Sequence, residues 1–259
     1  MVLFLSECPR WLAALILIVL PTAAAMCGTI LIRRHIGLER LTTNNEIAGF
    51  KFATVGVIYA VLLAFAVIVV WERFEDGETA VTQEAGAAAT IYRLTAGPGT
   101  EAVTVRGALT NYLELAINED WPQMANEKES PAVTKALDAL YTATIAFTDR
   151  PSPAAATYAE LLKQLDSITQ ARRTRLHLAA GIVPEVLWGV LFSGAALTVA
   201  FTFFFGTENL AAQVMMTGIL TVIVFMGLFV IVSIDHPFTG PVHIDSAPLE
   251  TVLKDFRTG

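Results

Sequence analysis

Residue types that could perform chemistry are few in this sequence, and none stands in a catalytic pattern. There is no H-E-x-x-H helix, no G-x-S-x-G elbow and no Walker loop. The four histidines are His35, His177, His236 and His243. His236 and His243 lie near Asp235 and Asp245, and all four are residue types that metals accept. They lack the regular spacing of a metal centre, so we expect no enzyme activity, metal or cofactor.

One stretch holds residues that could act on ions. Gly56, Ala60 and Ala64 recur every four residues, which gives a stripe of small side chains suited to close helix packing. At about 100° per residue, another face carries a lysine followed by bulky apolar residues, namely Lys51, Ile58, Leu62, Phe65 and Val69. If several copies packed through the small stripe, the bulky face would form apolar rings around an axis.

Rings of this kind gate ion pores by dewetting, and a ring of Lys51 at one mouth would favour anions. The alternative is that the bulky face contacts lipid and Lys51 extends its ammonium to the headgroups. The residues favour neither of the two. A further cationic set consists of Arg172, Arg173 and Arg175, and it ends less than two helical turns before an apolar run. We expect these arginines to form a basic collar against anionic lipid headgroups, with an anion-attracting vestibule as the alternative.

The amino-acid composition indicates which kind of secondary structure carries these residues. Of the 259 residues, 54% are hydrophobic and 16% charged, against about a quarter charged in a typical soluble domain, and the mean hydropathy is +0.58. Four runs are long enough to cross a bilayer as helices: 11–32, 52–71, 182–205 and 210–234. The chain is therefore predicted to be an integral membrane protein. Its net charge of −7 argues against nucleic acid as a partner.

Between the second and third runs, residues 72–181 have the composition of a soluble helical domain. No proline interrupts Glu72–Leu94, which could simply prolong the second helix. Further helices are expected at about 101–119, 132–147 and 154–180, with no strand pattern. The prediction is an all-α fold of four transmembrane helices with a helical domain inserted between the second and third. Its parts are a first transmembrane pair (1–71), the inserted domain (72–181), a second pair (182–234) and a tail (235–259).

Two short segments resemble a known family. The segment before the second run carries Asn44, Asn45, Glu46 and Gly49. The end of the fourth run carries Asp235, Pro237, Phe238 and Gly240. Together with the four runs and their helical insert, these residues resemble the bacterial and plant bestrophin-like family of unknown function, which is distantly similar to bestrophin ion channels.

The resemblance implies a homo-oligomer, a pentamer in true bestrophins, whose central pore is lined by the second helix. It implies passive ion conduction, with anions slightly preferred, and lipid, inorganic ions and further copies of the chain as partners. Four spans place both termini and the inserted domain on one side, and the basic residues favour the cytoplasm of a bacterial inner membrane. Only Asp245 and Glu250 stand where bestrophins hold calcium, so we expect no such clasp. The alternative is a non-conducting scaffold or sensor whose helical domain binds a protein partner.

Overall fold

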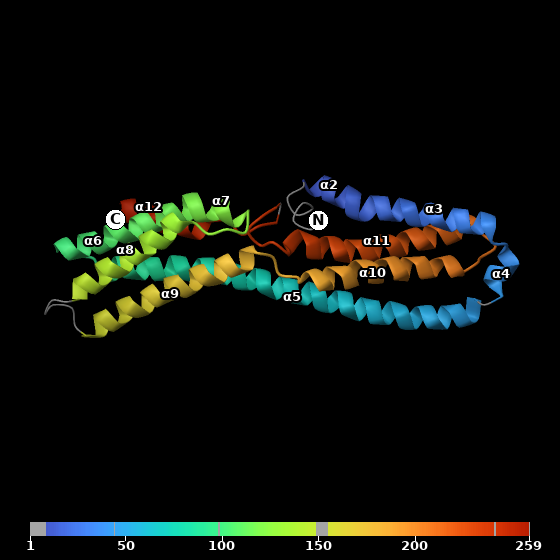
Figure 1. The fold of residues 1–259 in the computed structure, drawn as a ribbon, viewed down its shortest axis with the longest axis horizontal. Coiled ribbons are helices and arrows are strands. Elements are labelled where there is room, and N and C mark those ends of the chain that lie inside the picture. Colours follow the sequence, from blue (N-terminus) through green and yellow to red (C-terminus); the bar gives the residue numbers. More distant parts are fainter. Residues whose placement is uncertain (1–8, 44, 98, 149–154, 241, 259) are drawn as a thin grey trace. The chain divides into compact units, whose positions relative to one another are not determined.

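The computed structural model describes residues 9–43, 45–97, 99–148, 155–240 and 242–258, and these residues form helices and no strand. The prediction of an all-helical chain is confirmed for this part of the protein (Figure 1). The chain divides into two compact units. Unit 1 combines Met1–Glu72 with Ile182–Asp235, and unit 2 combines Arg73–Gly181 with His236–Gly259.

Unit 1 contains the apolar helices. Its elements are α2 (Arg10–Ala14), a π-helical turn (Leu15–Val19), α3 (Leu20–His35), α4 (Leu38–Thr42), the first part of α5 (Asn45–Leu94), α10 (Glu185–Phe201), a 3-10 turn (Thr202–Phe204) and α11 (Leu210–Ile234). Four helical stretches of the described chain are long and apolar enough to cross a membrane: Trp11–His35, Asn45–Leu94, Glu185–Phe204 and Leu210–Ile234. Two of these helices begin at residues suited to a helix start, since Pro184 precedes α10 and the Asn209 side chain accepts a hydrogen bond from the Ala212 amide of α11 (3.2 Å).

Close helix contacts in unit 1 are made over glycines. A Cβ built on Gly194 of α10 would lie 2.7 Å from the Tyr59 ring of α5, and one built on Gly227 of α11 would lie 2.5 Å from Leu63 of α5. The Tyr59 hydroxyl also donates to the Leu191 carbonyl oxygen (3.1 Å). Such small-residue contacts are how helices associate where lipid offers no hydrophobic driving force. They fix which face of α5 the other helices of unit 1 cover.

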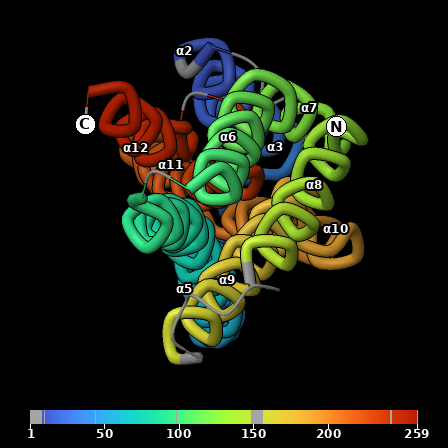
Figure 2. Tube along the Cα trace, turned by 90° about the vertical axis from the view of Figure 1, so that its left-hand side faces the viewer, coloured from blue at the N-terminus to red at the C-terminus, as the bar shows by residue number. Residues whose placement is uncertain are grey.

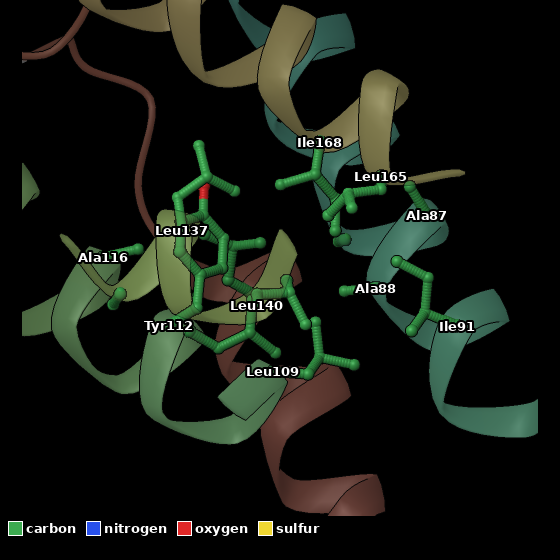
Figure 3. Packing of buried hydrophobic residues seen from close by; sticks show 14 of the residues in the cluster. Ala87, Ala88, Ile91, Leu109, Tyr112, Ala116, Leu137, Leu140, Leu165 and Ile168 are labelled. Carbon is green, nitrogen blue, oxygen red and sulfur yellow. The ribbon is translucent and has the colours of Figure 1, made fainter. Parts of the chain in front are cut away.

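Unit 2 is a bundle with its own core. It contains the rest of α5, α6 (Thr100–Leu115), a π-helical turn (Ala116–Asp120), α7 (Trp121–Met124), α8 (Pro131–Thr148), α9 (Ala155–Ala179) and α12 (Ala247–Thr258). Helix α8 packs on both α6 and α9, and α12 packs on α6 (Figure 2). Figure 3 shows the apolar side chains that α5, α6, α8 and α9 direct toward one another, among them the fully buried Ile91, Leu109, Leu140 and Leu165.

The end of the chain belongs to this bundle. Helix α12 buries Leu249 and Leu253 in the core, and the Phe256 ring stacks on Tyr92 of α5 with centroids 3.9 Å apart. The Tyr92 hydroxyl donates to the Phe256 carbonyl oxygen (3.0 Å). This helix was not predicted from the sequence, although the apolar residues of α12 recur at helical spacing.

Candidate functional site

The bulky face of α5 lies open in unit 1. Ile58, Phe65 and Val69 are 66%, 64% and 48% exposed, Leu62 is half-buried and Lys51 is exposed. Tyr59, on the face of α5 that packs on α10, is by contrast only 6% exposed. Only 11% of the most apolar window of α5 is buried within the chain. The face must therefore meet lipid or further copies of the protein.

Part of this face borders an apolar groove. Leu62, Phe65 and Val69 line it from α5, while Pro184, Leu187 and Leu191 line it from the start of α10. The groove holds about 210 Å³. No charged side chain lines the groove, so its surface is apolar throughout.

The small stripe makes no packing contact inside the chain. Ala60 and Ala64 are exposed, and a Cβ built on Gly56 would meet nothing within 4 Å. The packing role expected for these three residues thus has no partner among the described residues of one chain. It stays a prediction for contacts between copies.

Asn45, the first residue of α5, holds the loop between α10 and α11. Its side-chain amide donates to the Gly206 carbonyl oxygen (2.7 Å), and its amide oxygen accepts from the Gly206 backbone nitrogen (3.1 Å). Asn44 lies outside the described residues. Glu46 is exposed, and a Cβ on Gly49 would lie 3.9 Å from the Phe205 ring. Asn45 therefore ties the start of α5 to the loop.

Two further side chains bind the same loop. Arg33, at the end of α3, donates to the Thr207 carbonyl oxygen (2.7 Å). Gln213 of α11, which is 5% exposed, donates to the Phe205 carbonyl oxygen (2.6 Å). Three helices thus supply polar side chains to loop peptide groups that would otherwise lack partners in an apolar environment.

Asp235 performs a similar task where α11 ends. Its carboxylate accepts hydrogen bonds from the backbone nitrogens of Ile182 (3.2 Å) and Val183 (2.8 Å), in the segment that leads into α10. Asp235 as a whole is only 1% exposed. A buried anion is thereby satisfied by peptide groups, and the two ends of the α10–α11 hairpin are joined.

The remaining motif residues shape a turn in unit 2. The Pro237 carbonyl oxygen accepts from the Ile244 backbone nitrogen (2.7 Å), and the Phe238 ring packs edge-on against Trp121 with centroids 6.1 Å apart. Gly240 has φ +78°, a conformation that side chains with a Cβ rarely adopt. These residues are structural, and they bring no reactive groups together.

The expected basic collar is wrong for two of its three arginines. Arg172 and Arg175 are 6% and 0% exposed, and only Arg173 faces solvent. Arg172 binds the Asp120 carboxylate through Nε (2.8 Å) and Nη2 (3.2 Å). Two guanidinium groups buried in this way cannot contact lipid headgroups.

Arg175 binds a second buried carboxylate. Its Nε and Nη2 donate to Glu84 of α5 (3.0 and 3.1 Å), and Nη2 also reaches Asp120 (3.4 Å). The guanidinium lies over the Trp121 ring, 4.5 Å from its centroid. Burial lowers the pKa of Arg175, but Glu84, Tyr112 and Asp120 together outweigh that effect and raise the pKa above its ordinary value.

The Tyr112 hydroxyl completes this charge cluster by donating to Glu84 (2.6 Å). Its burial, reinforced by the Glu84 charge, raises the pKa of Tyr112 well above the ordinary value. Sequence reasoning missed Glu84, Tyr112 and Asp120. One signal was available, because Arg172 and Arg175 continue the apolar stripe of α9, placed at helical spacing after Leu165 and Ile168.

No group of three or more histidine, cysteine, aspartate or glutamate side chains in the described part of the chain could hold a metal ion. His236 lies 3.6 Å from Glu127 and is 7% exposed, whereas His243 is exposed with Nδ1 2.8 Å from the Gly240 carbonyl oxygen. Asp245 accepts a hydrogen bond from the Ala247 backbone nitrogen at the start of α12 (3.1 Å).

Comparison with known proteins decides the family. The model of the bestrophin-like domain matches residues 19–249, most of the chain. The chain belongs to the bestrophin-like family. The resemblance found in the motif residues is thereby confirmed. No curated protein matches the chain.

Solved structures share the fold. A crystal structure of a mutant of a bacterial bestrophin homologue from Klebsiella pneumoniae has a TM-score of 0.74 at 14% identity, covering 93% of this chain and 98% of that one. A crystal structure of the same homologue solved by Zn-SAD phasing has a TM-score of 0.72 at 14% identity, covering 93% and 97%. At this identity the likeness extends to the fold alone.

Proposed function

We propose that this bestrophin-like protein is a homo-oligomeric ion channel that conducts ions passively along the open face of α5. The observation that carries the proposal is the uncovered row of Ile58, Leu62, Phe65 and Val69, in a stretch that bears no charge between residues 52 and 71. Copies of the chain arranged around an axis would turn this row into apolar rings, which control ion passage through their hydration.

Assembly through the stripe of Gly56, Ala60 and Ala64 agrees with the lack of a packing partner for this stripe among the described residues. We propose a pentamer, as the family resemblance implies, in a bacterial inner membrane with both termini and unit 2 in the cytoplasm. A ring of Lys51 at one mouth would give a slight preference for anions. Lipid, inorganic ions and copies of the chain are the proposed partners.

The test is electrical recording from the purified full chain in a planar bilayer under an asymmetric KCl gradient. Discrete conductance steps are expected, and their reversal potential reports the sign of the preferred ion. Phe65→Ala should raise the conductance because it removes a bulky apolar ring. Val57→Ala is the matched control, since Val57 is 63% exposed but lies about 100° around the helix from Ile58.

Two results would contradict the proposal. One is the absence of any current from a verified oligomer at all pH values and calcium concentrations. The other is a conducting protein whose steps respond equally to both variants. Silence together with a protein bound at fixed stoichiometry would instead favour a scaffold or sensor whose helical unit holds that partner.

A further inference from the structure

We propose that Glu72 is a second determinant of ion selectivity, placed at the opposite end of the α5 face from Lys51 and acting against it. This inference rests on the proposed channel function. It concerns the last residue of α5 that belongs to unit 1, where the uncharged stretch 52–71 ends.

Glu72 continues the row of apolar residues. It follows Phe65 by seven residues and Val69 by three, the spacing that keeps side chains on one helix face. Lys51 precedes Ile58 by seven residues, so the same row begins with a cation and ends with an anion. Both side chains are exposed.

The separation of the two charges matches a bilayer. Lys51 and Glu72 are 21 residues apart on one unbroken helix, which corresponds to about 32 Å at 1.5 Å per residue. A hydrocarbon core is about 30 Å thick. Each charge therefore stands at its own boundary of the membrane, where an ion would enter or leave the apolar rings.

The charge of Glu72 is not neutralised within the described chain, since no ion pair or hydrogen bond engages its carboxylate there. Of the charged residues in the next helical turn, Arg73 binds Asp76 at 3.2 Å, and the exposed Glu75 follows Glu72 by three residues on the same side of α5. This end of the row is consequently anionic, with Glu72 next to the apolar residues and Glu75 one turn farther along the helix. In an oligomer the carboxylates form a ring, which attracts cations and repels anions.

The size of the effect follows from Coulomb's law. A unit charge about 7 Å from an ion in water changes the free energy of the ion by about RT, so its local concentration changes about threefold. Because one mouth attracts anions and the other attracts cations, the two rings oppose each other. The protein should then select only weakly between ions of opposite sign.

The experiment measures the ratio of chloride to potassium permeability from the reversal potential in a KCl gradient. Glu72→Gln should raise this ratio about threefold, and Lys51→Gln should lower it by a similar factor. The double variant should have a permeability ratio close to that of the parent protein. Glu78→Gln is the matched control, because Glu78 is an exposed carboxylate of the same helix that lies about 120° around the axis from Glu72 and should leave the ratio unchanged. Raising the salt to 1 M should reduce every shift, since the Debye length falls to about 3 Å.

Should Glu72→Gln fail to assemble, Glu72→Cys in a Cys8→Ser, Cys27→Ser background provides a second measurement. Cationic and anionic thiol reagents should then shift the reversal potential of one preparation in opposite directions. A conducting parent whose Glu72→Gln variant keeps the parental ratio, or shifts no more than Glu78→Gln, overturns the role of Glu72 and leaves the channel standing. A silent parent overturns the proposed channel and this role with it.

Discussion

The buried charge cluster of unit 2 allows a sharp test of what holds the bundle together. Two arginines and two carboxylates, Arg172, Arg175, Glu84 and Asp120, are almost completely removed from solvent and balance each other in charge. Arg175→Met leaves one negative charge in excess. The buried Glu84 then keeps only the Tyr112 hydroxyl as a partner in the cluster.

Breaking a buried pair by removing one partner typically costs about 3–5 kcal/mol, because the other charge stays buried without compensation. For a chain of this size each kcal/mol shifts the melting temperature by about 2–4 °C. Arg175→Met should therefore lower the melting temperature by roughly 6–20 °C. Glu84→Gln combined with Arg175→Met removes one charge of each sign and leaves the pair of Arg172 and Asp120 intact, so it should be more stable than Arg175→Met alone.

The assay is loss of helical circular dichroism on heating the full chain in detergent, with every variant scanned at one rate because membrane proteins often unfold irreversibly. Arg173→Met is the control, since Arg173 is exposed on the same helix and its loss should change stability by less than about 0.5 kcal/mol. The reasoning fails if Arg175→Met melts like Arg173→Met. It also fails if the double variant loses the sum of its two single effects.

Three further predictions concern single positions. Tyr112 keeps its proton in the folded protein above pH 10.0, where the unfolded chain loses it, so stability should fall with rising pH there by up to about 1.4 kcal/mol per pH unit. Tyr112→Phe should remove that slope in melting curves between about pH 9 and pH 11. Asn45→Ala should cost about 1–3 kcal/mol and speed hydrogen exchange in the α10–α11 loop, because Gly206 loses both of its bonds to the side chain. Gly227→Val should destabilise unit 1, whereas Gly56→Val should leave the melting of the monomer unchanged and weaken the oligomer, as light scattering would show.

The elements that could be predicted from the sequence are those whose signal is contained in a short window. A run of about 20 apolar residues is sufficient by itself to indicate a span. The fourth run, expected at 210–234, is indeed α11, Leu210–Ile234. Helix α5 extends to Leu94 beyond the predicted span because nothing in residues 72–94 ends it. Helix α12 was missed because it contains few apolar residues, and their role is evident only once they are seen to pack in the core of unit 2.

The cluster around Arg175 could not be predicted in the same way, because its signal is spread over distant parts of the chain. Glu84 stands 91 residues from Arg175, and Asp120 stands 52 residues from Arg172. Charged residues just before a span can contact lipid headgroups only if no other helix covers their face. Whether a helix covers that face depends on segments that are distant in the sequence. The open face of α5 presents the reverse case. Its row from Lys51 to Glu72 can be predicted from local spacing, but no other part of the described chain covers that row, so the proposed pore requires contacts between copies that one sequence does not display.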